Sequence, residues 1–178
     1  MKKIYVVLAM TGTYASRFIN FFNRADYVHV SISLDAQFKE MYSFSRIYTP
    51  FIVPAGFVHE SFSHGVYAKH QEGECRVYEI TVTNGQYYLL TRELERFKRN
   101  PKNFTYNYVG LPFMLFNVSW ERKRHYTCSQ WVAYLLQERA GIIDFGKPYS
   151  LVKPQDFMKS LHTFESYKGT IHNYAECL

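Results

Sequence analysis

The first part of the chain shows three different patterns of apolar and polar residues. Residues 4–10 form a continuous, β-branched apolar run, which is typical of a strand buried on both faces. Apolar side chains at helical spacing follow over residues 15–23, and residues 27–34 return to alternation with a period of two. A loop at Asp35-Ala36-Gln37 then predicts a hairpin whose second strand runs through residues 40–44.

The middle of the chain begins with a stretch that lacks a period. Residues 45–73 combine several Pro and Gly with many aromatics, and we expect an ordered loop connection there. Residues 75–83 alternate as a strand. Leu90, Leu94 and Phe97 mark a helix that ends near Pro101, because proline disfavours helix in the residue before it.

The last part of the chain predicts three helices and a strand. We expect a helix over residues 106–115, a second that begins at Cys128 and is capped by Gly141, and a third that begins at Pro154. The tail over residues 164–174 is a candidate final strand. Helices and mainly antiparallel strands in separate runs indicate the α+β class, and 178 residues fit a single domain, 1–178.

The segment R-H-Y-T-C-S-Q-W-V-A-Y-L-L carries the strongest chemical signal. Thr127 and Gln130 are spaced as a capping box, so Cys128 should occupy the first turn of the helix. Unpaired N–H groups and the helix dipole favour the thiolate there, and the thiolate is the nucleophilic form. The competing interpretation is a buried cysteine that packs as a small apolar residue.

His29 lies in the alternating strand Y-V-H-V-S-I-S-L and is the candidate base for Cys128, although an imidazole there could equally be a hydrogen-bonded core residue. A third group should orient it from the neighbouring strand. A three-residue loop places Ser43 opposite His29, whereas an even-numbered loop presents Glu40, Tyr42 and Phe44. The sequence leaves this register open.

An oxyanion hole would use the backbone N–H of Cys128 and one further donor, for which Tyr126 is a candidate; a packed aromatic is the alternative. His125 is a rival base, but it lies too close in sequence to face Cys128 across a cleft. Three histidines lie near Glu60 in the sequence, but their spacing matches no known zinc site: His59, His64 and His70. We therefore expect no metal and no cofactor.

The charge and cysteine content restrict the location and partners. The net charge of +6 lies mostly in mixed-sign stretches, which argues against nucleic-acid binding, although E-R-K-R-H before Cys128 could attract an anionic substrate. Three cysteines without a C-x-x-C pair fit a reducing compartment. The apolar run near the start is at the short limit for a signal peptide, and no run reaches the roughly 18 apolar residues of a membrane span. We expect a cytoplasmic protein without stable membrane insertion; its oligomeric state stays open.

The order of the two motifs, Y-V-H-V-S-I-S-L-D followed by H-Y-T-C-S-Q-W-V-A-Y-L-L, resembles the circularly permuted papain-like hydrolases, the YiiX-like bacterial branch of the NlpC superfamily. In that group, which includes lecithin:retinol acyltransferase-like proteins, the histidine strand precedes the cysteine helix. The resemblance spans residues 4–157. It implies a small antiparallel sheet packed against the cysteine helix, with Cys128 as nucleophile and His29 as base.

The third position of the family, often Glu or His, falls near Ser43, which is a departure and leaves room for an unusual activity. The resemblance implies a thiol hydrolase, a cysteine peptidase or amidase that cleaves an amide bond through an acyl-enzyme. Two alternatives stay open: a lipid-type acyltransferase with the same Cys/His pair, and a non-catalytic ligand-binding module. Peptides, amides and lipid-like molecules are the candidate substrates.

Overall fold

The computed structural model describes residues 1–10, 27–48 and 53–177. The described residues form one eight-stranded sheet in the order β7-β6-β4-β3-β2-β1-β5-β8, in which only β6 and β7 pair in parallel. The strands are β1 (Lys2–Ala9), β2 (His29–Ser33), β3 (Met41–Arg46), β4 (Ala55–Glu60), β5 (Glu74–Val82), β6 (Thr105–Tyr106), β7 (His125–Tyr126) and β8 (Glu165–Thr170).

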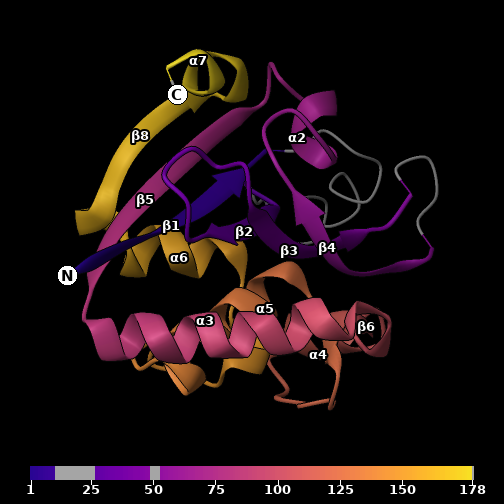
Figure 1. Ribbon diagram of the computed structural model, residues 1–178. Helices are drawn as coiled ribbons and strands as arrows, with labels where there is room; N and C mark the ends of the chain where they lie inside the picture. Colours follow the sequence, from indigo (N-terminus) through magenta and orange to yellow (C-terminus); the bar gives the residue numbers. More distant parts are fainter. Residues whose placement is uncertain (11–26, 49–52, 178) are drawn as a thin grey trace.

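Helices cover both faces of this sheet (Figure 1). The α-helices are α2 (Val66–Lys69), α3 (Asn84–Arg99), α4 (Gly110–Leu115), α5 (Cys128–Ala133), α6 (Pro154–Ser160) and α7 (Ile171–Glu176). A π-helix, η2 (Tyr134–Arg139), continues α5, and short 3-10 turns occur at η1 (Pro101–Asn103), η3 (Tyr149–Leu151) and η4 (His162–Phe164). The α+β class is thus confirmed.

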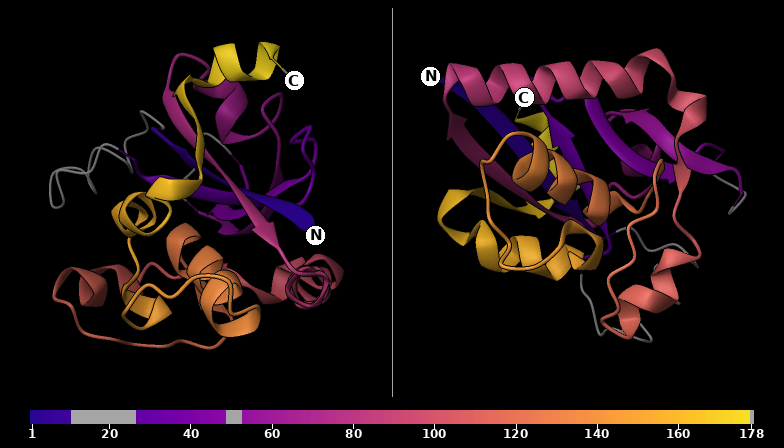
Figure 2. Two further views of the ribbon diagram at one scale, coloured as in Figure 1. Left: turned by 90° about the vertical axis from the view of Figure 1, so that its left-hand side faces the viewer. Right: turned by 90° about the horizontal axis from the view of Figure 1, so that it is seen from below.

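The alternation of side chains along β1 and β2 separates two apolar clusters. Ile4, Val6 and Leu8 point to the face covered by α3, α5 and α6, whereas Tyr5 and Val7 point to the face covered by α2 and α7. The larger cluster on the α5 face includes Trp131, which is fully buried. Two views at right angles show α4 at the periphery of the molecule (Figure 2).

The β2–β3 hairpin differs from both registers considered for it. Ile32 pairs with Tyr42 and Ser33 with Met41, so the connection is longer than three residues. Ser33 closes it by donating to the backbone oxygens of Asp35 and Glu40. This longer loop moves the expected orienting residues away from His29.

Residues 45–73 were expected to lack regular structure, and that expectation is wrong. Strand β4 pairs with β3 along its whole length, and α2 follows it. The period-two signal of β4 is short and lies between Pro54 and Ser61, which is why the pattern did not reveal it. The expected helix over 15–23 lies outside the described residues, and the helix expected over 106–115 forms only over α4.

Among the described residues, no helix combines the length and apolar character needed to cross a membrane.

Candidate active site

Cys128 is the first residue of α5, as the capping pattern predicts. Thr127 Oγ1 accepts from the Gln130 backbone N–H at 3.2 Å, and Gln130 Oε1 accepts from the Thr127 N–H at 3.0 Å. The thiol is 5% exposed and donates to the carbonyl oxygen of Val28, immediately before β2, at 3.7 Å. The helix start therefore holds the sulfur against the beginning of the histidine strand, and Gly141 follows η2 with a φ of 57° as the expected cap.

His29 is the first residue of β2, and its side chain contacts two residues that the sequence analysis did not link to it. Its Nε2 lies 2.8 Å from Oε2 of Glu60, the last residue of β4, and both side chains are buried. Its ring packs against Tyr67 of α2, with ring centroids 5.6 Å apart. Because Glu60 occupies Nε2, the other ring nitrogen is the one left for Cys128, whose sulfur is among the groups that raise the pKa of His29.

The register explains how Glu60 reaches His29 from two strands away. Met41 pairs with Glu60 and with Ser33, so Glu60 and the odd-numbered residues of β2 share one face of the sheet. The intervening positions on this face carry the small buried side chains of Ser31 and Ser43. Small residues leave room for a long carboxylate and an imidazole to meet across the sheet.

The surroundings of His29 favour its protonated form. Burial by itself lowers the pKa, but the Glu60 carboxylate and the hydrogen bonds with Cys128 and Glu60 outweigh it and raise the pKa of His29 from 6.5 to about 10. An imidazolium between a carboxylate and a sulfur can pass its proton to a leaving group. The same proton would stabilise a thiolate.

The two residues proposed to orient His29 make other contacts. Ser43 donates its hydroxyl to the Val30 carbonyl oxygen at 2.6 Å. Glu40 is exposed, accepts from the Tyr42 hydroxyl at 2.8 Å and pairs with Lys98 at 3.7 Å. Neither contacts His29, and Glu60 takes the place that was assigned to them.

Tyr126, the candidate second oxyanion donor, is a packed aromatic residue in the structure. It is buried on β7 and packs in the apolar cluster, with its ring 5.4 Å from that of Phe44. Tyr106, on the neighbouring strand β6, lines the pocket at Cys128 instead. Burial and the neighbouring Cys128 and Tyr108 raise the pKa of Tyr106 well above its ordinary value, so its hydroxyl stays protonated and can act as a donor.

A small pocket of about 40 Å³ lies at Cys128. Leu111 and Met114 of α4 form its apolar side, and Tyr106, Lys153 and Gln155 are among its polar lining. This space holds one or two water molecules.

The remaining histidines form no second site in the described part of the chain. Nδ1 of His125 lies 2.6 Å from the Thr105 hydroxyl at the sheet edge, away from Cys128. His59 Nε2 contacts the Lys39 carbonyl oxygen, and His64 Nδ1 contacts two serine hydroxyls. Across the described ranges no three metal-ligating side chains come together.

Glu60 and Tyr106 are the site residues that sequence reasoning missed. Glu60 lies in F-V-H-E, where Phe57 and His59 face one side of β4 while Val58 and Glu60 face the other. That short alternation was the available signal. Tyr106 lies on a two-residue strand, which has no detectable period.

Comparison with protein-family models, with curated proteins and with solved structures finds no match to this chain.

Proposed function

We propose that the protein is a thiol hydrolase of the permuted papain-like type, in which Cys128, His29 and Glu60 act as one catalytic unit on an amide bond. The observation that carries this proposal is the buried hydrogen bond between Glu60 and His29, next to a sulfur that the start of α5 holds against Val28, the residue before His29. Nucleophile, base and orienting group are the three parts that thiol hydrolysis needs. The order of histidine strand before cysteine helix supports the permuted arrangement.

The first half of the reaction forms a thioester. The Cys128 sulfur attacks the amide carbonyl carbon, the oxygen becomes an oxyanion, and the C–N bond then breaks as His29 gives its proton to the leaving amine. Water attacks the thioester in the second half, loses a proton to His29 and releases the carboxylic acid and the sulfur. Glu60 holds the imidazole in place throughout both halves.

Two donors are positioned for the oxyanion. The backbone N–H of Cys128 belongs to the first turn of α5 and has no partner within the helix. The Tyr106 side chain lines the same pocket as Cys128 and would supply the second donor through its hydroxyl. Donors directed at the developing negative charge lower the barrier without reorganisation during the reaction.

Acyl transfer is the second candidate function, and the apolar wall of the pocket favours it. Leu111 and Met114 beside Cys128 suit an aliphatic acyl chain better than a charged peptide. The same thioester would then pass to an amine or alcohol in place of water. Product analysis in the presence of an amine acceptor separates the two outcomes.

The test of the proposal is mass spectrometry of the protein after exposure to a panel of activated amides and esters. We expect acylation of the peptide that contains Cys128, and loss of that adduct in Cys128→Ala and His29→Ala. Cys177, an exposed thiol far along the chain, reports nonspecific acylation in the same sample. Adducts on Cys177 alone, or an adduct that persists on Cys128 in His29→Ala at an unchanged rate, would remove the proposal.

A further inference from the structure

Exposed apolar side chains gather on one short segment, residues 109–120. Phe116 is 81% exposed and Val118 is 50% exposed. The other large apolar residues of this segment with more than a third of their surface exposed are Val109, Phe113, Leu115 and Trp120. Large groups of exposed apolar side chains are uncommon on soluble proteins, and they usually indicate an interaction site.

The segment is held in shape by its own backbone. At the end of α4 the Val118 N–H donates to the Phe113 carbonyl oxygen at 2.8 Å, and the Asn117 N–H donates to that of Met114 at 3.3 Å. Asn117 has a φ of 58°, so these bonds form a Schellman cap. Phe113 and Trp120 also pack edge to face at 4.6 Å. Phe116 is therefore presented at the tip of a closed turn and is not part of a fraying end.

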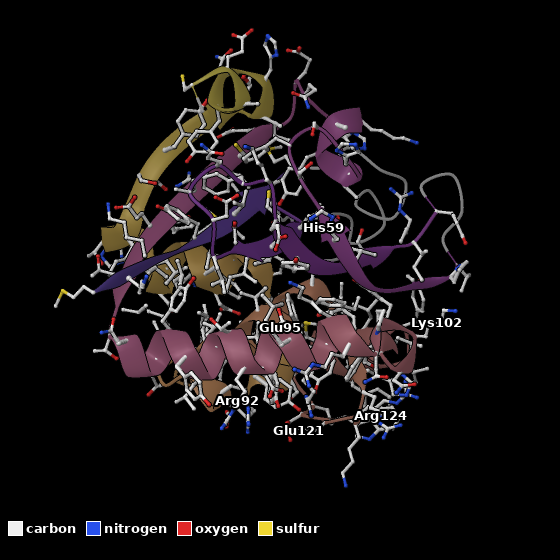
Figure 3. The ribbon with its side chains drawn as sticks, in the orientation of Figure 1. His59, Arg92, Glu95, Lys102, Glu121 and Arg124 are labelled. Carbon is white, nitrogen blue, oxygen red and sulfur yellow. The ribbon has the colours of Figure 1, made fainter. Side chains whose placement is uncertain are left out.

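Basic residues border this apolar segment. Residues 101–124 contain four basic side chains, Lys102, Arg122, Lys123 and Arg124, against the single acidic side chain of Glu121. Arg122 lies over the Trp120 ring at 5.3 Å. Lys102 and Arg124 lie on the side of the molecule where α4 and β6 are drawn (Figure 3).

We propose that residues 109–124 form a docking surface for an anionic lipid membrane. Apolar side chains at a tip, a tryptophan beside them and a basic border are the pattern of a segment that lies in the interface while its cations meet lipid phosphates. A second copy of the chain fits less well, because a symmetric contact through this segment would bring its basic residues against one another.

Docking would place the Cys128 pocket at the lipid surface. Leu111 and Met114 of the same helix line that pocket, so α4 has one side on the site and the other on the proposed membrane face. Asn107 ties α4 to the site helix, since its side chain accepts from the Gly110 N–H at 3.0 Å and donates to Gln130 Oε1 at 3.2 Å. The docking itself does not depend on catalysis, and Cys128→Ala should bind membranes as the unchanged protein does.

The test is binding to vesicles of phosphatidylcholine with and without phosphatidylserine, followed by flotation and by tryptophan fluorescence. The chain has two tryptophans, and Trp131 is fully buried, so a blue shift on binding reports Trp120. We expect binding to anionic vesicles, a blue shift that disappears in Trp120→Phe, and retained flotation of that variant.

Matched variants distinguish binding through this surface from nonspecific adsorption to vesicles. Phe116→Ser should weaken binding by about tenfold, because it removes an exposed aromatic side chain that the lipid would bury, whereas Tyr88→Ser, at an exposed tyrosine on α3, should not. Arg124→Glu should also weaken binding by about tenfold, whereas Arg92→Glu, further along α3, should have little effect.

Three results would overturn the inference. The first is an absence of binding to anionic vesicles, and the second is equal binding to neutral vesicles. The third is an equal loss of binding in the control variants Tyr88→Ser and Arg92→Glu. A dimer in light scattering that disappears in Phe116→Ser would also reject the membrane in favour of a second copy.

Discussion

Replacing Glu60 by glutamine tests the charge balance around His29 through the pH dependence of stability. The raised pKa of His29 means that folding favours its protonated form. Its contribution to the free energy of unfolding is fully present below the unfolded pKa of 6.5 and is lost as the pH rises through about 10. Among the causes that raise this pKa, the charge of Glu60 is the largest, so the variant should lose a large part of the contribution.

The magnitude follows from the two pKa values. One pKa unit corresponds to about 1.4 kcal/mol, so a shift from 6.5 to about 10 contributes about 4 kcal/mol at pH 7 and less than about 1 kcal/mol at pH 10. We expect Glu60→Gln to be less stable than the unchanged protein by up to about 4 kcal/mol at pH 7. The difference should shrink to below about 1 kcal/mol at pH 10.

Urea denaturation followed by circular dichroism at pH 7 and pH 10 measures both differences. Glu72→Gln makes the same chemical change at an exposed position and should leave the free energy of unfolding unchanged at both pH values. His29→Gln removes the titrating group and should lose the same pH dependence as Glu60→Gln. A Glu60→Gln deficit that is equally large at pH 7 and pH 10 would refute the reasoning, because it would reflect packing and not the proton on His29.

Further variants test the elements that hold the site. Tyr106→Phe should slow acylation of Cys128 by about a hundredfold with little change in stability, because it would remove the proposed oxyanion donor; an unchanged acylation rate would exclude that role. Gln130→Ala should cost about 3 kcal/mol in urea denaturation, since it loses the buried capping-box bond from the Thr127 N–H and a buried hydrogen bond to the Ser150 carbonyl oxygen. The same change in the exposed capping box of α3, Gln86→Ala, should cost only about 1 kcal/mol, and equal costs would contradict this account. Gly56→Ala should cost about 2 kcal/mol or more, because a Cβ there would lie 2.5 Å from the Phe104 carbonyl oxygen; thermal denaturation at an unchanged midpoint would refute it.

The strength of local patterns decided which parts of the fold could be predicted. The buried run of β1, the alternation of β2 and β5, and the amphipathic spacing of α3 each extend over enough residues to specify an element. The start of α5 was predictable because a capping box depends on residues three apart. These features all reside in short stretches of sequence.

The third site residue depends on pairing between distant strands, which local patterns do not specify. The seven residues between Ser33 and Met41 set a register that the turn signal at Asp35 did not reveal. Strand β4 is short and contains Gly56, whose backbone lies against that of Phe104, so its apolar pattern is weak. Glu60 reaches His29 only because the serines between them are small, and this is a property of the assembled sheet.

The alkylation rate of Cys128 as a function of pH tests most directly whether Cys128, His29 and Glu60 act together. Iodoacetamide labelling, read by peptide mass spectrometry, compares Cys128 with the exposed Cys177 in the same sample. An ordinary exposed thiol should gain close to a hundredfold in rate between pH 6 and pH 8. We predict that the pH profile of the Cys128 rate differs from that of Cys177, because the raised pKa of His29 keeps the imidazole protonated across this range, and that Glu60→Gln changes the Cys128 profile. A Cys128 rate that rises as steeply as that of Cys177, and equally in both proteins, would contradict the account.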